Sequence, residues 1–392
     1  MATVKVKKRI IQNIVNSVSV KDSIPSLPER VKRVLAKPLP VISGEESYYW
    51  LLSRDGITQS AISVYEECPR KLQYKLREGL TKGTSDHSLD FGNMFHHILD
   101  KCYSSIKTFP VRKGINPKTA WTTIINQACK EYYYKQSKDL DVKDTQKFEL
   151  MFGTCKLMLE HYFDWWGKED LSLNFVGVEQ LFDVPYTLRN GVKIRLRGKI
   201  DGILKIDGGY WILENKTKGS IDDIGAYSVN GVVESMGYNL QVLFYCLAIK
   251  GVYGVYPKGV IYNLIKRPGQ EFKGTFNRKP ETLPEYYERI KKDIAEKIVE
   301  VGGKKFNPYL LRYHVRITEE EIQTWSLQDF DSVIEEIYQW DMQNLISRRV
   351  QASCFMFRKP CEFLDICSSG SKVGYSKREH VFPELVSEEE DE

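Results

Sequence analysis

The sequence predicts a mixed α/β fold, in which helices flank a central sheet, with a helical insertion and a C-terminal helical lobe that carries cysteines. Three runs between residues 175 and 218 alternate apolar with polar residues and are rich in β-branched and aromatic side chains, which is typical of neighbouring strands. Stretches of helical period precede and follow them. The chain has 392 residues, 42% of them apolar and 28% charged, which suffices for a buried core without disulfide bonds.

The first half is predicted to be mainly helical. Residues 1–55 combine a basic start with four prolines, which favours an arm over regular helices. Two short helices joined at the Cys-Pro-Arg segment 68–70 are expected next. Residues 91–107 and 119–166 have helical period and little glycine or proline, which predicts a helical insertion over about 105–170.

The second half is predicted to supply the sheet. The expected elements are strands over 175–188, 193–206 and 210–218, a helix over 234–252, a strand over 258–267, a helix over 284–302, a strand over 312–318 and a helix from 319 to about 347. The turn residues Asp207, Gly208 and Gly209 make the second and third strands a hairpin, so the first three strands are expected to be antiparallel.

These elements form one predicted domain over 56–370. Its core motifs lie over 91–266, and its C-terminal lobe with a cysteine cluster lies over 280–370. The basic arm 1–55 precedes this domain, and an acidic tail over 371–392 follows it.

Charge and hydropathy limit the kind of partner. Residues 1–40 carry nine Lys or Arg against two acidic residues, and residues 388–392 are all acidic. Because the net charge is +5, about +3 remains for the rest, so a polyanion site must be a local groove. No run approaches the roughly 18 apolar residues of a membrane helix, and no secretion signal precedes the fold. We therefore expect a cytoplasmic protein with no membrane partner.

Asp201, Glu214 and Lys216 carry the strongest indication of chemistry. Asp201 is expected to end one strand, and Glu214 and Lys216 lie two apart on the next strand, so their side chains share one face of the sheet. Two carboxylates and the backbone carbonyl of Asn215 offer the oxygen ligands that Mg²⁺ and Mn²⁺ bind. Lys216 beside them would orient a water molecule and neutralise charge that develops on a phosphate.

An exposed hairpin with a surface Glu and Lys is the common alternative. The apolar run Tyr-Trp-Ile-Leu directly before Glu214 indicates a buried strand, where ionised groups need partners. The 13 residues from Asp201 to Glu214 also suit a hairpin that sets the two side by side. The pattern therefore favours a metal site.

In the order of its motifs the sequence resembles the PD-(D/E)xK nuclease superfamily, and within it the RecB-like branch that includes AddB-type and CRISPR-adaptation exonucleases. The motifs are, in chain order, Gly-x-x-x-His at Gly92 to His96, a strand Asp at Asp201, (D/E)xK at Glu214 to Lys216, and Gln-x-x-x-Tyr at Gln241 and Tyr245. Singly, each motif also suits an ordinary helix or strand. Their order on the predicted elements, from about Thr58 to Cys367, implies a restriction-endonuclease-like core.

The resemblance also implies roles for individual residues. His96 would be an additional metal ligand, and Gln241 and Tyr245 would lie near the active site and the nucleic-acid backbone. Glu179 stands where many relatives carry Glu, which implies a supporting role. A solvent-facing strand Glu is the alternative there.

Four of the eight cysteines match a subset of this branch that holds a [4Fe-4S] cluster. The matching residues are Cys68, Cys354, Cys361 and Cys367, and four thiolates are the ligand set of such a cluster. Six residues separate Cys354 from Cys361 where relatives have two, and Arg358 stands at the expected ligand position. Structural Zn²⁺ in the same site, or ordinary buried cysteines, remain alternatives.

As a function, the resemblance implies an Mg²⁺- or Mn²⁺-dependent deoxyribonuclease, expected to be an exonuclease. It would act on single-stranded or duplex DNA ends in recombination, repair or phage DNA metabolism, in a bacterial or phage-infected cell, with a helicase or recombination protein as partner. Two alternatives are a non-catalytic DNA-binding or scaffold subunit on a nuclease-like fold and a structure-specific endonuclease. The intact set of Asp201, Glu214 and Lys216 argues against the scaffold.

Overall fold

The computed structural model describes residues 49–82, 91–108, 116–137, 142–218, 236–274, 279–343 and 347–386. All of them belong to the compact unit Ser47–Glu392. The predicted arm up to residue 48 and the acidic residues 388–392 lie outside the described residues. Trp50, which we expected in the arm, is fully buried, and Phe382, which we expected in the acidic tail, is buried as well. The folded body therefore includes residues at both predicted margins.

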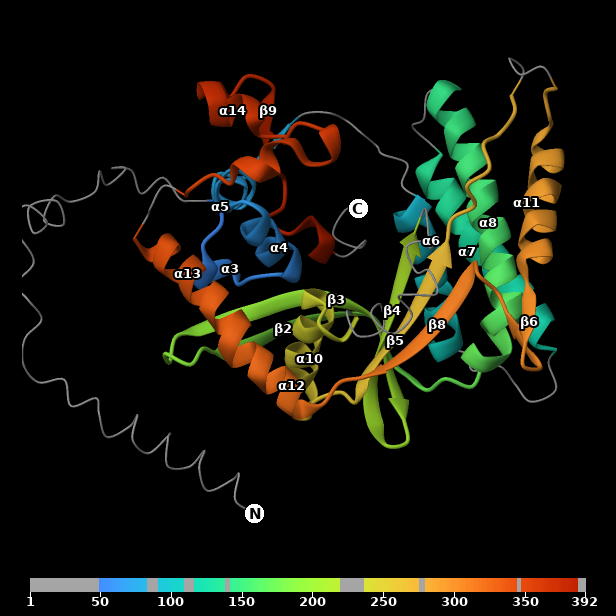
Figure 1. The fold of residues 1–392 in the computed structure, drawn as a ribbon, viewed down its shortest axis with the longest axis horizontal. Coiled ribbons are helices and arrows are strands. Elements are labelled where there is room, and N and C mark those ends of the chain that lie inside the picture. The colour runs from blue at the N-terminus through green and yellow to red at the C-terminus, as the bar shows by residue number, and fades with distance from the viewer. Residues whose placement is uncertain are drawn as a thin grey trace, which may run out of the picture. The chain divides into compact units, whose positions relative to one another are not determined.

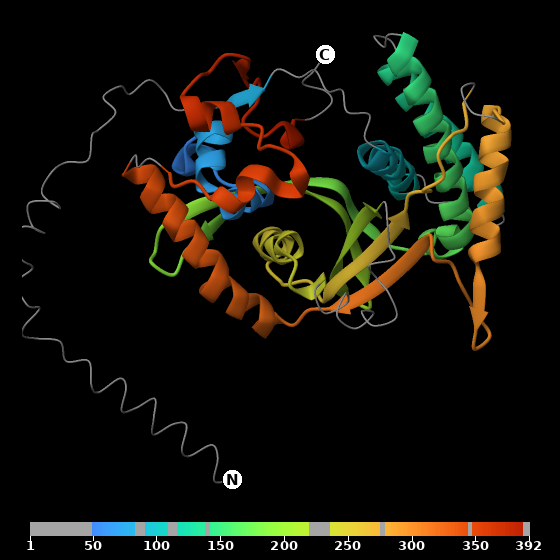
Figure 2. The same cartoon turned by 45° about the horizontal axis from the view of Figure 1, so that its top comes forward.

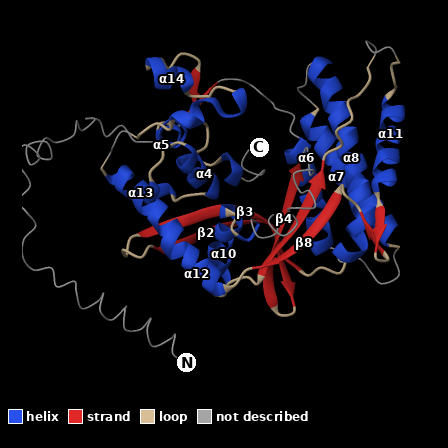
Figure 3. Ribbon diagram, in the orientation of Figure 1, coloured by secondary structure: helices blue, strands red, loops and turns tan. Residues whose placement is uncertain are grey.

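A five-stranded mixed sheet forms the centre of the fold (Figure 1, Figure 3). Its strands are, in spatial order, β2 Phe175–Thr187, β3 Lys193–Ile206, β4 Gly209–Lys218, β5 Gly259–Lys266 and β8 Leu310–Arg316. β4 and β5 are parallel, and the other neighbours are antiparallel. The predicted mixed α/β fold with a central sheet is confirmed.

The β3–β4 hairpin turns at Asp207 and Gly208, which both have left-handed φ angles of 48° and 76°. A two-residue turn of this kind matches the twist of the flanking strands. The expectation that Asp201 ends its strand is wrong. β3 continues through the buried residues Ile203 and Leu204 to Ile206, because apolar side chains on both faces keep the chain extended between two core regions.

The two strands of this hairpin diverge near the predicted site. β3 and β4 pair from Ile206 with Gly209 up to Gly202 with Leu213, and β4 then continues as a partner of β5. A Cβ atom on Gly202 would lie 2.9 Å from the Leu213 Cβ, so glycine permits the close approach of the last pair. Asp201 and Glu214 are the first residues past this pair, on diverging strands.

Helices cover both faces of the sheet. One core cluster joins the sheet to α4 Gln59–Glu67, α10 Leu240–Tyr253, α12 Glu319–Trp325 and α13 Asp331–Met342. The other joins it to α6 Phe91–Thr108, α7 Pro117–Gln136, α8 Val142–Asp170 and α11 Leu283–Lys297. In Figure 1 the last three of these helices lie side by side.

Several predicted boundaries change. The helical stretch predicted over 119–166 is two helices, α7 and α8. The helix predicted over 284–302 ends at Lys297, where the short strands β6 Val299–Val301 and β7 Lys304–Phe306 begin a separate ribbon. None of the described helices is long and apolar enough to cross a membrane.

The segments at the two ends of the folded body meet (Figure 2). The N-terminal segment contains α3 Leu52–Asp55, α4, α5 Pro69–Leu72, the π-helical turn Gln73–Arg77 and β1 Leu80–Lys82. The C-terminal segment contains the 3₁₀ helix Gln351–Arg358, α14 Leu364–Ser369, β9 Tyr375–Lys377 and the turn Pro383–Leu385. β1 pairs with β9, and Arg77 forms a fully buried ion pair of 2.7 Å with Asp341 of α13. The predicted pair of short helices around 68–70 is confirmed as α4 and α5.

Candidate active site

Glu214 lies on β4 with its side chain almost completely buried. It is 1% exposed, and the Glu214 Oε2 has no hydrogen-bond partner among the residues that the structure describes. The Lys216 Nζ forms an ion pair of 2.5 Å with the Glu214 Oε1. Burial raises the pKa of Glu214 to about 8; the nearby Asp201 carboxylate adds to this rise, and Lys216 opposes it. The predicted surface alternative for Glu214 is therefore wrong.

Lys216 is held by the two residues of the Gln-x-x-x-Tyr motif. Its Nζ donates to the Gln241 Oε1 at 2.7 Å, and the Gln241 Nε2 donates to the Tyr245 hydroxyl at 2.9 Å. Both residues lie on one face of α10, whose first turn is capped by the Asn239 side chain. The helix thus fixes the direction in which the ammonium group points.

Asp201 lies across the gap between the diverging strands. Its Oδ2 accepts a hydrogen bond of 3.1 Å from the backbone N–H of Asn215, and the His96 Nδ1 lies 3.6 Å from the same oxygen. His96 is on α6, which packs against both β2 and β4. The structure therefore brings together His96, Asp201, Asn215 and the neighbouring Glu214, which come from three elements.

Glu179 also belongs to this neighbourhood. On β2, Val178 pairs with Gly202 and Gln180 with Ile200, so Glu179 stands opposite Asp201. Glu179 has a left-handed φ of 48°, which a residue with a Cβ rarely adopts. Its carboxylate forms an ion pair with the Lys199 Nζ.

Asp100 and Lys199 are two members that the sequence argument missed. Asp100 is buried on α6, one turn after His96. Burial raises the pKa of its carboxyl well above the ordinary value, and the nearby Glu179 and Asp201 carboxylates raise this pKa further. Lys199 precedes Asp201 by two residues on β3. The sequence offered two signals for them. Asp100 lies four residues after His96, on the same helix face, and Lys199 lies two residues before Asp201, on the same strand face.

The donor set suits a hard divalent cation. As they stand, no three described His, Cys, Asp or Glu side chains form a ready ligand group, so small side-chain movements must accompany binding. The buried Glu214 Oε2, which has no hydrogen-bond partner among the described residues, can nevertheless bind a cation beside a second carboxylate and a backbone carbonyl. The residues present fit Mg²⁺ or Mn²⁺.

The four cysteines of the predicted cluster lie around one small pocket. Cys68 precedes α5, and Cys354, Cys361 and Cys367 come from the C-terminal segment. Arg70 and Lys71 are among the other residues that line this pocket. The remaining cysteines, Cys102, Cys129, Cys155 and Cys246, are buried in helices, and none of the eight cysteines forms a disulfide bond.

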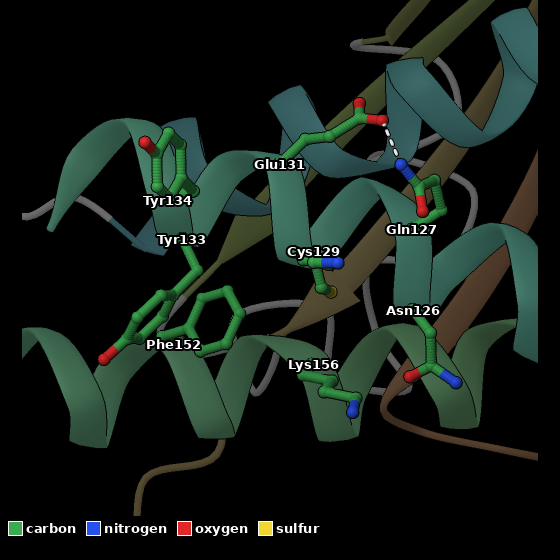
Figure 4. A pocket seen from close by; sticks show the side chains of 9 residues that line it. Asn126, Gln127, Cys129, Glu131, Tyr133, Tyr134, Phe152 and Lys156 are labelled. Atoms are coloured by element: carbon green, nitrogen blue, oxygen red, sulfur yellow. Dashed lines mark hydrogen bonds between the residues drawn. The ribbon is translucent and has the colours of Figure 1, made fainter.

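A further pocket lies between α7 and α8 and contains none of the candidate residues (Figure 4). Its walls come from residues 126–134 of α7 and from Phe152 and Lys156 of α8. They are largely apolar, and the described carboxylates of the candidate site lie elsewhere. The candidate active-site residues therefore lie where β3 and β4 diverge, and not at this pocket.

No curated protein matches the chain. A solved structure, the crystal structure of SSO0001, is 13% identical over 71% of this chain and 97% of that chain, with a TM-score of 0.27, at which the likeness carries no structural argument. The model of the PD-(D/E)XK nuclease superfamily matches residues 56–368, which include every candidate site residue discussed above. With this match over most of its length, the chain belongs to the PD-(D/E)XK nuclease superfamily, whose members are metal-dependent nucleases.

Proposed function

We propose that the protein is an Mg²⁺- or Mn²⁺-dependent exodeoxyribonuclease of the RecB-like branch. The observation that carries the proposal is the buried Glu214 carboxylate, which has a lysine ammonium on one side and Asp201 on the other. A buried ionisable group of this kind costs stability, so its presence favours a catalytic role over a structural one.

Four groups would hold the cation: the Asp201 and Glu214 carboxylates, the Asn215 carbonyl and, as a further ligand, His96. A divalent ion in this position lowers the pKa of water and neutralises charge on a phosphodiester. The backbone N–H of Asn215 keeps the Asp201 carboxylate turned toward β4. Glu179 and Asp100 would support Asp201 from β2 and α6.

Lys216 would act on the reacting atoms directly. Gln241 and Glu214 each hold its Nζ from one side, which leaves a further N–H free to donate to the attacking water or to a phosphate oxygen. A fixed cation there stabilises the negative charge that grows as the phosphodiester is attacked. Tyr245 keeps Gln241 in place rather than touching the substrate.

The finer assignment to DNA ends follows the motif order shared with end-processing relatives. We place this activity in the cytoplasm of a bacterial or phage-infected cell, in repair, recombination or phage DNA metabolism. The sequence has no Gly-x-x-x-x-Gly-Lys phosphate loop, so any unwinding would require a separate helicase partner.

The test is the degradation of end-labelled linear single- and double-stranded DNA beside a closed circle, with Mg²⁺ or Mn²⁺. The wild type should shorten the linear DNA, and Glu214→Gln and Lys216→Ala should each lose at least about 100-fold in rate, as expected for a residue that stabilises the transition state. Lys218→Ala is the matched control, because Lys218 lies on the same strand two residues later with an exposed side chain.

The substrates also separate the alternatives. Cleavage of the closed circle would select a structure-specific endonuclease. A wild type that is inert with both cations and still binds DNA would select the scaffold function and overturn the proposal.

We also propose that Cys68, Cys354, Cys361 and Cys367 hold a [4Fe-4S] cluster, with structural Zn²⁺ as the alternative. The support is that all four thiols line one pocket although they come from distant parts of the chain. Arg70 and Lys71 beside them would offset the negative charge of a thiolate-bound cluster. No ready ligand group is formed by the described cysteines as they stand, so the loop from Cys354 to Cys361 would have to close around the cluster.

A further inference from the structure

We infer that Asn263 and Arg312 are positioning residues for the candidate active site, acting through the side chain of Asn215. This inference rests on the proposed function, because it concerns how the same cation site is held. It assigns a role to residues on the opposite side of the sheet from Glu214 and Lys216.

Asn215 connects the two faces of β4. Glu214 and Lys216 point toward α10, so the alternation of the strand sends the Asn215 side chain to the other face, where it is fully buried. There its Oδ1 accepts a hydrogen bond of 2.9 Å from the Nδ2 of Asn263, its register partner on the parallel strand β5. The backbone of the same residue supplies the N–H to Asp201 and a carbonyl to the proposed cation.

Arg312 fixes the orientation of the Asn263 amide. The Arg312 Nε donates to the Asn263 Oδ1 at 2.7 Å. Because a guanidinium can only donate, the Asn263 Nδ2 must face the other way, toward Asn215. A flipped amide would put two acceptors together and two donors together, so the direction of the Asn263–Asn215 bond is set by Arg312.

Arg312 is itself held in a buried polar network. It forms an ion pair of 2.8 Å with Asp170, which is fully buried, and donates to the Tyr162 hydroxyl at 2.8 Å. Tyr162 also accepts from the Asn263 Nδ2 at 2.9 Å, and its hydroxyl lies 2.6 Å from the Tyr103 hydroxyl. The network thus anchors Asn215 to α8 and, through Tyr103, to α6, the helix that also carries His96.

The consequence is a constraint on the proposed ligands. Rotation of the peptide units around Asn215 would move the carbonyl and the N–H to Asp201 together, and the amide bond behind the strand opposes this rotation. Partners that orient a ligand from behind contribute to metal affinity about as much as 10- to 100-fold. Removing the Asn263 donor should therefore weaken cation binding.

The experiment measures Mn²⁺ binding to the full chain by electron paramagnetic resonance, without DNA. Asn263→Asp keeps the acceptor for Arg312 and the size of the side chain, and it loses the donor to Asn215. Asn263→Ala removes both. We expect each variant to bind Mn²⁺ about tenfold more weakly, and we expect its DNA cleavage to recover when Mn²⁺ is raised by a similar factor.

Asn307→Ala is the matched control. Asn307 is equally buried at 1% exposed, and its side chain bonds to His161 and to the Tyr309 backbone, outside the Asn215 network. It should lower the melting temperature and leave Mn²⁺ affinity unchanged.

Two results would overturn the inference while the proposed function stands. The first is that both Asn263 variants bind Mn²⁺ as tightly as the wild type. The second is that Asn307→Ala loses as much Mn²⁺ affinity as the Asn263 variants at a similar loss of melting temperature. A wild type that neither binds Mn²⁺ nor cleaves DNA would instead overturn the proposed function, and this inference with it.

Discussion

At the scale of single residues, the most consequential feature is a buried carboxylate that contacts a partly exposed ammonium group. Glu214 is 1% exposed, Lys216 is 32% exposed, and the Lys216 Nζ lies 2.5 Å from the Glu214 Oε1. A buried carboxylate of this kind is a poor way to stabilise a fold, since its removal from water costs several kcal/mol when it is ionised. The arrangement is explained if the site is built to receive a second positive charge.

The raised pKa of Glu214 makes the stability of the metal-free protein depend on pH. Because the pKa is about 8 in the folded protein and near 4.5 when exposed, the folded state binds more protons than the unfolded state between these values. Stability is therefore fully present at low pH and is lost as the pH rises toward and through 8. Each unit of difference corresponds to about 1.4 kcal/mol, so the full loss is a few kcal/mol.

The measurement is the melting temperature of metal-free protein from pH 5 to 9. Glu214→Gln cannot ionise and should remove most of the decline seen in the wild type, so that it becomes the more stable protein at pH 8.5. Glu288→Gln, at an exposed position on α11, should leave the wild-type decline unchanged. A decline of equal steepness in Glu214→Gln would assign the pH dependence to another group.

At the scale of elements, the β3–β4 hairpin shows what sequence reasoning can reach. Alternation and the Asp-Gly-Gly turn predicted both strands, and the spacing of Asp201 and Glu214 predicted their proximity. The strand predicted over 193–206 coincides with β3, whereas the expectation that Asp201 ends a strand is wrong, because Ile203 and Leu204 continue β3 beyond it. Local patterns thus predict the strands and the proximity of their motif residues, and they do not show where within the strand a motif residue lies.

The residues behind the strand were out of reach for a physical reason. Asn215 and Asn263 meet through a parallel pair, whose partners are 48 residues apart along the chain, and neither has a local pattern that sets its register. Asp170 and Arg312 are further apart still and look like surface charges in the sequence. A buried polar network of this kind is specified by tertiary packing, so only the structure identifies it.

The contact between the π-helical turn Gln73–Arg77 and α13 is expected to carry much of the stability of the terminal segments. The Arg77 guanidinium lies 4.2 Å from the centre of the Trp340 ring and donates to both the side chain and the backbone oxygen of Asp341. Arg77→Ala leaves the Asp341 carboxylate buried with part of its partners gone. We expect it to lower the free energy of unfolding by about 3 to 5 kcal/mol, measured by urea denaturation.

The matched control is another Arg paired with an acidic residue of the same helix. Arg189 pairs with Glu335 of α13 at 2.7 Å, and its side chain is 44% exposed. Arg189→Ala should cost no more than about 1 kcal/mol, because water screens an exposed ion pair. Equal losses in the two variants would show that burial of the Arg77 pair contributes nothing.

At the scale of the folded body, the N-terminal segment is joined both to the C-terminal segment and to α13. β1 pairs with β9, and Asp341 of α13 binds both the Arg77 side chain and the Leu52 N–H, the latter at 3.0 Å. The cysteine pocket lies between the same two segments. A metal cluster there would add to these connections rather than supply the only one among the described residues.

This redundancy decides what loss of the proposed cluster should do. Full-length protein purified without oxygen should be brown, absorb broadly near about 400 nm and contain about four irons per chain. Cys68→Ser should lose iron and colour and melt at a lower temperature, yet keep the circular dichroism of the wild type, because the strand pair and the buried ion pair do not depend on a thiol. Cys155→Ser, at a fully buried thiol in α8 outside the pocket, should lose stability while keeping its iron. Colourless wild-type protein without metal would refute the cluster. Zinc without iron would identify a structural zinc site instead. An unfolded Cys68→Ser variant would show that the cluster, and not the protein contacts, holds the two segments together.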